Sequence, residues 1–169
     1  AEQALVELEA AGLGHLEEGR LVLRHPLLRS AALAGMPAQR HRDLHRRLAE
    51  VDGLAPEVRL LHRAHATVGP DEALADGLIQ AAGALRERGG PEAAARLLDR
   101  AVELTGDEDR RWRARIDAAD ALAVSGAARA ARHRLRAVQD SGPAEDLRTE
   151  TSLRLAWLDA LGGDPLGAW

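Results

Sequence analysis

The chain has 169 residues, of which 46% are hydrophobic and 30% are charged, with a formal net charge of −4. This balance fits a folded soluble protein, and the lack of any cysteine excludes disulfides, thiolate metal sites and cysteine nucleophiles. The net charge predicts no general attraction to nucleic acid or to an anionic membrane, and no apolar run reaches the roughly 20 residues needed to cross a bilayer. With three Trp as the only aromatic residues, the core must be built from Leu, Ala and Val, which favour helices.

The N-terminal segment predicts a helix, a hairpin and a second helix, in that order. Residues 4–11 carry apolar side chains at helical spacing. Residues 15–24 contain two short apolar stretches around Glu18 and Gly19, which predicts a β-hairpin with the only strands of the chain. Pro26 stands where the second helix can begin. This order is typical of the C-terminal half of a winged helix.

Two more helices are expected before the sequence becomes repetitive. The first covers residues 38–51, with Leu44, Leu48 and Val51 as its apolar face. The second covers residues 57–68 and ends before a Gly-Pro pair. Together they connect the hairpin segment to the rest of the chain.

The remaining sequence predicts a series of helical hairpins. Breaks at Gly90, Gly126 and Gly163 lie 36 and 37 residues apart, and Ala94 recurs 36 residues later as Ala130. Hairpins of about this length, with small residues where two helices cross, are typical of tetratricopeptide-type repeats. The expected helices cover residues 72–88, 91–104, 107–124, 127–139 and 144–161.

We therefore expect a mainly α protein with three parts. Residues 1–53 would form the C-terminal part of a winged-helix domain with a short β-hairpin, and residues 54–71 a connecting helix and linker. Residues 72–169 would form a truncated tetratricopeptide-like solenoid. The sequence begins inside the predicted winged helix and stops before a capping helix, so we expect an internal segment of a longer protein.

Five motifs follow one another along the chain: residues 24–31 (RHPLLRSA), 37–49 (PAQRHRDLHRRLA), 61–62 (LH), 69–72 (GPDE) and 89–95 (GGPEAAA). In this order they resemble the large LuxR-type regulators, the MalT-like members of the STAND class of signalling ATPases, over roughly residues 1–140. The resemblance implies an upstream nucleotide-binding domain that uses ATP and ADP and a downstream helix-turn-helix domain, although similar arrangements also accompany cyclase and kinase domains. We expect a cytoplasmic location. The segment itself is expected to bind no cofactor.

The resemblance also implies a role for a histidine of the winged helix, which in this class can reach the phosphates of bound ADP. By position the candidate is His25, with Arg24 and Arg29 nearby, and a helix that begins at Pro26 directs backbone N–H groups toward an anion. The alternative is a structural histidine that bonds a hairpin carbonyl. A phosphate-binding loop of the G-x-x-x-x-G-K-[ST] type cannot occur because the chain has no lysine, so we expect no enzymatic activity from this segment.

Two tryptophans are the candidates for partner binding. Trp112 shares a helical stripe with Ile116, and Trp157 shares one with Leu153. Such residues usually fill the core between hairpins, but they could instead line a groove that binds a small-molecule or protein effector.

We expect structural roles for the remaining histidines, arginines and acidic residues that could suggest a functional site. His41 and His45 stand one helical turn apart, which can hold a metal, but no third ligand is placed by the sequence, so we expect no metal site. The arginines between residues 40 and 47 could contact DNA, but we expect them on a solvated face or paired with the acidic first helix. The acidic residues at 107–109, 117 and 120 are expected to cap helices or face solvent rather than to catalyse a reaction.

The sequence thus predicts a regulatory or sensor segment of an ATP-dependent LuxR-type transcriptional regulator. Effector or partner binding on the repeats would be coupled to the nucleotide state of the upstream domain, with no direct nucleic-acid or membrane contact by this segment. The alternative is a tetratricopeptide-like interaction scaffold without nucleotide coupling.

Overall fold

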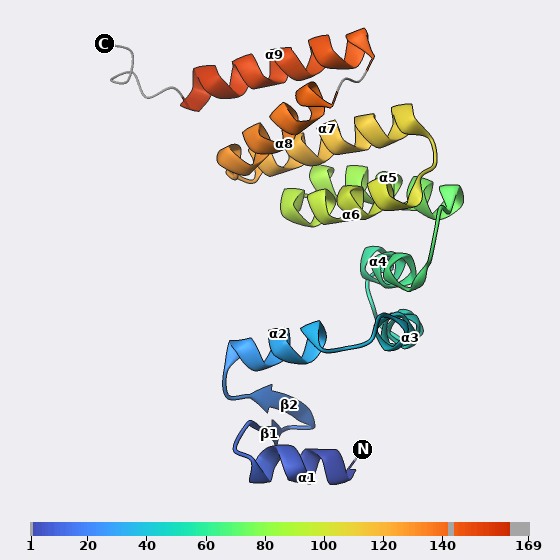
Figure 1. Ribbon diagram of the computed structural model, residues 1–169, viewed down its shortest axis with the longest axis vertical. Coiled ribbons are helices and arrows are strands. Elements are labelled where there is room, and N and C mark those ends of the chain that lie inside the picture. The colour runs from blue at the N-terminus through green and yellow to red at the C-terminus, as the bar shows by residue number, and fades with distance from the viewer. Residues whose placement is uncertain (1, 142–143, 163–169) are drawn as a thin grey trace. The chain divides into compact units, whose positions relative to one another are not determined.

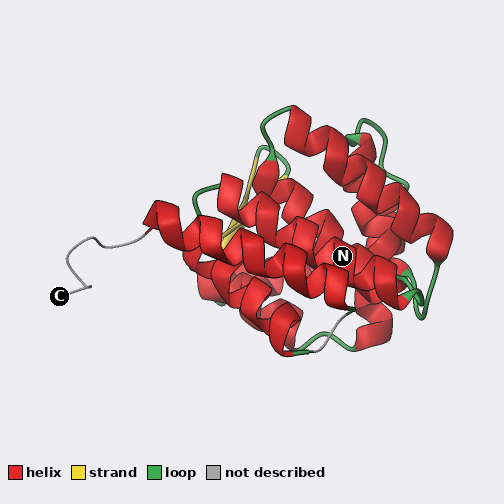
Figure 2. Ribbon diagram, turned by 90° about the horizontal axis from the view of Figure 1, so that it is seen from above, coloured by secondary structure: helices red, strands yellow, loops and turns green. Residues whose placement is uncertain are grey.

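The computed structural model describes residues 2–141 and 144–162, without the side chains of Glu2, Arg29, Leu161 and Gly162. In this part of the chain there are nine helices and one two-stranded antiparallel sheet. The helices lie within two residues of the positions predicted from the sequence. The prediction of a mainly helical protein with a short hairpin is therefore confirmed (Figure 2).

The chain divides into two compact units, residues 1–44 and 45–169. The first unit contains α1 (Glu2–Ala10), β1 (Gly14–Glu17), β2 (Arg20–Leu23), α2 (Pro26–Ala34) and the first part of α3 (Ala38–Ala49). The second contains the rest of α3 and the six helices that follow. The predicted domain boundaries at residues 53 and 71 stay predictions.

The hairpin of the first unit forms where the sequence places its turn. Its strands pair in register from Gly14 with Leu23 to Glu17 with Arg20. Glu18 and Gly19 both have positive φ, at 48° and 76°, as a two-residue type I′ turn requires. At Gly14 a Cβ atom would lie 2.7 Å from the Val22 carbonyl oxygen, so only glycine allows this close backbone approach.

Helix α3 does not bury the apolar face that the sequence suggested. Leu44 is 38% exposed, and Val51, which lies beyond the end of the helix, is 46% exposed. The partly buried positions of α3 include His41, His45 and Leu48, which recur at helical spacing. The two histidines, rather than Leu44, thus share the more protected side of the helix with Leu48.

The second unit continues as an array of helices in which each packs on the next along the chain: α4 (Pro56–Ala66), α5 (Glu72–Glu87), α6 (Pro91–Leu104), α7 (Glu108–Val124), α8 (Ala128–Asp140) and α9 (Glu145–Gly162) (Figure 1). Two of these helices begin at an aspartate that caps the helix N-terminus. Asp71 and Asp107 cap α5 and α7 by accepting hydrogen bonds from the backbone N–H groups of Leu74 and Arg110, each at 2.9 Å.

Two hydrophobic clusters hold the array together, and α7 contributes to both. Ala114 and Ala118 on one side of α7 pack with the buried residues of α5 and α6. Trp112, Ile116 and Ala119 on another side pack with the buried residues of α8 and α9. Because each cluster joins successive helices, the core is continuous along the array, as stacked hairpins require.

The burial pattern corrects the repeat register that the sequence suggested. Ala94 is fully buried, but Ala130, which lies 36 residues later, is exposed, and it is the next residue, Ala131, that is fully buried. The glycine that ends α5 with positive φ is Gly89 rather than Gly90, and it lies 37 residues before its counterpart Gly126. The second helices therefore repeat at 37 residues. The expected third break at Gly163 lies outside the described residues.

Candidate ligand-binding groove

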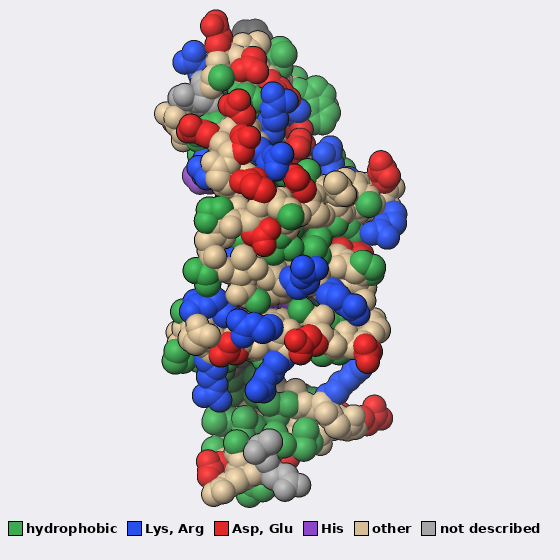
Figure 3. Space-filling model, turned by 90° about the vertical axis from the view of Figure 1, so that its right-hand side faces the viewer, with side chains coloured by type: hydrophobic (Ala, Val, Ile, Leu, Met, Phe, Trp, Pro, Cys, Tyr) green, Lys and Arg blue, Asp and Glu red, His purple; other side chains and the backbone are tan. Residues whose placement is uncertain are grey.

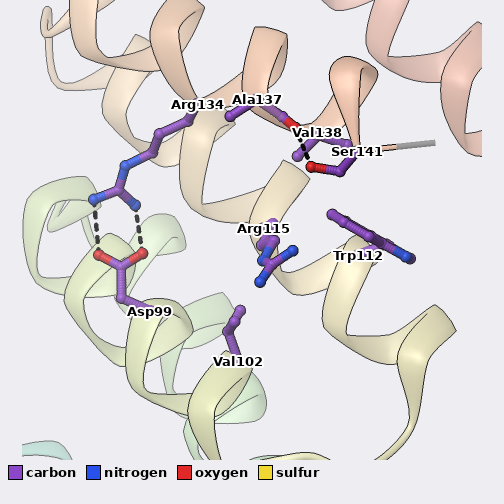
Figure 4. Close-up of a pocket in the computed structure, with 8 residues that line it drawn as sticks. All are labelled: Asp99, Val102, Trp112, Arg115, Arg134, Ala137, Val138 and Ser141. Carbon is purple, nitrogen blue, oxygen red and sulfur yellow. Dashed lines mark hydrogen bonds and ion pairs between the residues drawn. The ribbon is translucent and has the colours of Figure 1, made fainter. Parts of the chain in front are cut away.

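The second unit contains a groove between α6 and α8 that lies over the N-terminal half of α7 (Figure 4). Its volume is about 380 Å³, which is in the range of small-molecule sites, roughly 300–1,000 Å³. Helices α6, α7 and α8 supply most of its lining, which combines charged and apolar side chains. The lining residues are Asp99, Val102, Trp112, Arg115, Arg134, Ala137, Val138 and Ser141.

An ion pair joins the two walls of the groove. Arg134 of α8 donates two hydrogen bonds to the carboxylate of Asp99 on α6, one of them at 2.9 Å between Nη2 and Oδ2. Two parallel bonds of this kind match the fork of a guanidinium group to a carboxylate and fix its orientation. Both charges of the pair are therefore already engaged.

The same type of link recurs along the array. Arg110 of α7 donates to Asp76 of α5 at 2.7 Å, and Arg154 of α9 donates to Asp120 of α7 at 2.7 Å. In each case an arginine reaches a carboxylate 34 or 35 residues earlier, two helices back in the array. The prediction that Asp120 faces solvent or caps a helix is wrong.

Trp112 and Arg115 form the floor of the groove. The guanidinium carbon of Arg115 lies 4.5 Å from the centre of the Trp112 ring, a cation–π contact. Arg115 is half-buried, and it makes no ion pair with any residue that the structure describes. In Figure 4 its guanidinium group is drawn between Trp112 and the Asp99–Arg134 pair. At the rim, the Ser141 hydroxyl donates to the Ala137 carbonyl oxygen at 2.6 Å.

The two tryptophans selected from the sequence lie in different environments. Trp112 is buried and packs in the same cluster as Ile116, as the core interpretation predicted. Trp157 is 58% exposed and Leu153 is 68% exposed, so the prediction that they fill the core between hairpins is wrong. The reason is the rotation of α9, which instead buries the helical stripe of Leu147, Thr151, Leu155 and Leu158.

His25 follows the hairpin of the first unit and caps α2. Its Nδ1 accepts a hydrogen bond from the backbone N–H of Leu27 at 3.2 Å, in place of the hairpin carbonyl considered from the sequence. With Nδ1 as acceptor, the neutral ring carries its proton on Nε2. His25 and Arg24 are exposed, and the side chain of Arg29 lies outside the described residues.

Histidines of α3 and α4 come together in a way that neither helix alone suggested. The Nδ1 atoms of His45 and His62 are 2.8 Å apart, and the rings of His45 and His65 are 4.8 Å apart between centres. Across residues 2–141 and 144–162, no group of three or more His, Cys, Asp or Glu side chains is arranged to hold a metal ion. Packing and hydrogen bonding account for this cluster.

Two carboxyl groups of the array titrate abnormally. Hydrogen bonds from the Gly106 backbone and the Thr105 hydroxyl lower the pKa of Glu72, which thereby connects the start of α5 to the turn after α6. Burial raises the pKa of Asp117, against the opposing effect of Arg86. Asp117 is therefore not the solvated residue that the sequence suggested.

Charged side chains of both signs are interspersed on the face shown in Figure 3. None of the described helices combines the length and apolar character needed to span a membrane.

Sequence reasoning found Trp112 but missed the rest of the groove. Arg115 and Arg134 are two of many arginines, and nothing in the local pattern separates them from solvated ones. The spacing of 34 or 35 residues between acid and arginine was the one available signal.

Comparison with known proteins adds no assignment, because the chain matches no family model and no curated protein or solved structure is significantly similar to it.

Proposed function

We propose that this chain is a binding segment built from helical hairpins, which takes a small-molecule effector or a short part of a partner protein in the groove between α6 and α8. The observation that carries the proposal is the groove itself. A concave site of about 380 Å³ combines an aromatic ring, aliphatic walls and two guanidinium groups, a combination typical of specific ligand sites.

The chemistry of the groove favours binding over catalysis. The carboxylate of Asp99 is held by Arg134, and the Ser141 hydroxyl donates to a backbone carbonyl. A general base needs a free acceptor near the proton that it removes, and a nucleophile needs such a base beside it. The groove is thus suited to recognition, and we expect no enzymatic activity from this segment.

A substitution that fills the groove tests the proposal. Ala137 is an exposed residue of the wall, so Ala137→Trp should block the groove and leave the core intact. Ala130→Trp is the matched control, because Ala130 is also exposed on α8 but lies two turns away and outside the groove. The measurement is a screen of small molecules and short peptides against the full chain by NMR, with the hits titrated into both variants.

Hits that perturb the Trp112 indole should bind the Ala130→Trp protein normally and the Ala137→Trp protein at least about tenfold more weakly. The proposal fails if the hits bind both variants equally well, or if no compound perturbs residues of the groove.

A second function, the nucleotide coupling of a LuxR-type regulator, is favoured by the arrangement at His25. The imidazole stands at the junction of hairpin and helix, and its Nε2–H is left as a donor when Nδ1 caps α2. Such a donor at a helix N-terminus suits a phosphate oxygen of ADP or ATP bound by an upstream domain. In this proposal residues 1–53 belong to a winged helix, residues 72–169 to tetratricopeptide-like repeats, and the protein is cytoplasmic.

The test uses the protein together with its nucleotide-binding domain. His25→Asn keeps an oxygen that can cap α2 but removes the imidazole, whereas His25→Ala removes both functions. Both variants should weaken ADP binding, and His15→Ala on the exposed face of the hairpin should not. Normal ADP affinity in His25→Asn and His25→Ala would exclude this coupling role.

A further inference from the structure

We infer that the groove between α6 and α8 selects a ligand that carries a carboxylate beside an apolar body, with Arg115 as the cation that binds it. This inference rests on the proposed binding function and specifies the class of ligand.

The charged residues that line the groove are Asp99, Arg115 and Arg134. Arg134 is neutralised by Asp99 through two hydrogen bonds. Arg115, the second arginine of the lining, has the Trp112 ring as its neighbour and no carboxylate partner within the described chain. The lining thus has one positive charge in excess, which a single carboxylate would neutralise.

The position and shape of the Arg115 guanidinium group suit it to bind a carboxylate. Arg115 is half-buried on the floor of the groove, where water screens its charge less than at a free surface. A guanidinium group presents paired N–H donors that match the two oxygens of a carboxylate. The Trp112 ring restricts the guanidinium plane from one side, so fewer side-chain conformations are lost when an anion binds.

The apolar walls of the groove indicate what the rest of the ligand should be. Val102, Ala137 and Val138 supply aliphatic walls close to the charged groups. An anion that is hydrated on all sides, such as inorganic phosphate, would leave these walls without a partner. A carboxylate attached to an aliphatic or aromatic group meets both parts of the site. The source can be a free carboxylic acid or the C-terminal carboxylate of a peptide, because both present the same chemistry.

The experiment compares matched charged and neutral probes on the full chain. Phenylacetate and phenylacetamide have similar shapes and differ in charge, and acetyl-Leu-Phe with a free or an amidated C-terminus gives the same comparison for a peptide. Each is titrated while the indole N–H signal of Trp112 is followed by ¹H–¹⁵N NMR. At least one carboxylate should shift that signal in a saturable way, with its amide about tenfold weaker or more, the loss typical of a charge-assisted hydrogen bond.

Variants locate the effect at one residue. Arg115→Gln should weaken binding of the carboxylate about tenfold or more, and Arg115→Lys, which keeps the charge but loses the paired donors, should fall between it and the unmodified protein. Arg113→Gln is the control, because Arg113 is an exposed arginine of the same helix outside the groove. Circular dichroism of each variant checks that the array is folded.

The outcomes separate this inference from the proposed function. Equal binding of amide and carboxylate at Trp112 would overturn the inference but leave a functional groove. Carboxylate binding that survives Arg115→Gln would also overturn it, and so would the absence of any shift with all four probes. Tighter binding of phenylacetate than of the peptide acid would identify a small-molecule ligand, and the reverse order a peptide ligand.

Discussion

The adjacent residues Ala130 and Ala131 of α8 give a direct test of how the hairpins stack. Ala131 is fully buried in the cluster that joins α7, α8 and α9, whereas Ala130 is exposed. Replacing either by Leu adds the same three carbons to the same helix, one residue apart, and changes helix propensity by the same small amount. Any difference in stability between the two variants therefore reports packing.

The expected difference follows from the contacts of each site. A leucine at position 131 must fit into the buried cluster of Ala131, whose members Ile116 and Leu135 are nearly or completely inaccessible to solvent. Overpacking of this kind costs about 1–3 kcal/mol. A leucine at position 130 projects into solvent and should change the free energy of unfolding by less than about 0.5 kcal/mol.

Urea denaturation followed by circular dichroism at 222 nm measures both effects as shifts of the midpoint, provided that the slope of the transition stays unchanged. Because helical arrays can unfold in more than one step, the coincidence of a second probe, tryptophan fluorescence, is the control for two-state behaviour. Equal stability of the two variants, or a larger loss for Ala130→Leu, would refute the register of 37 residues and the packing derived from it.

Three further predictions concern the core and the two abnormal carboxyl groups. Leu78→Ala, at a fully buried site of α5, should lower the free energy of unfolding by about 2–5 kcal/mol in the same urea assay, and an effect below about 1 kcal/mol would contradict the core described here. The pKa of Asp117 in the folded state lies above its ordinary value of 3.8, so between these two pKa values the folded state binds more protons than the unfolded state, and ionising the buried carboxyl destabilises the fold above the folded pKa. Asp117→Asn should therefore be more stable than the unmodified protein at pH 7, by a margin that disappears as pH falls to about 3.8. A margin that stays constant with pH would refute this. The pKa of Glu72 in the folded state lies below 4.5, so the ionised carboxylate stabilises the fold above pH 4.5 and this stabilisation is lost as pH falls through the folded pKa. In a pH series of thermal melts, Glu72→Gln should lower the melting temperature at pH 7 and leave it unchanged at the acid end. A lower melting temperature that persists at the acid end would argue against an electrostatic origin.

Much of the fold could be predicted because its determinants are local. Prolines at the start of α2, α4 and α6, the Asp residues at 71 and 107 and the Glu18-Gly19 turn all act within a few residues of where they stand in the chain. Helical periodicity did the rest, since stripes of Leu and Ala identify each helix before its neighbours are known.

The parts that the sequence did not predict depend on which helices meet. The 36-residue alignment of Ala94 with Ala130 was plausible in a chain so rich in alanine, and only burial shows that Ala131 is the true counterpart. Trp157 was assigned to the core because its stripe resembled a buried one, although α9 is rotated so that Leu155 and Leu158 are inside. The local periodicity of the sequence predicts which side of a helix is apolar, but it does not predict which other helix packs against that side.

The candidate site was predictable only in part for the same reason. Trp112 could be selected because tryptophan is rare in this chain. Arg115 is a candidate ligand-binding residue because it contacts the Trp112 ring and because the other arginine of the groove, Arg134, is already paired with Asp99. Both contacts depend on how α6, α7 and α8 pack together. The local sequence around an arginine does not show whether it lines a groove or faces solvent.

The Asp99–Arg134 ion pair bridges the two walls of the groove, α6 and α8, and so connects them across the opening before any ligand arrives. A ligand then meets a preorganised site, and less free energy is lost in ordering the walls when it binds. Association should consequently proceed in a single kinetic step whose rate rises linearly with ligand concentration. Lengthening the bridge with Asp99→Glu should alter which ligand sizes the groove accepts while leaving the charge that attracts them the same.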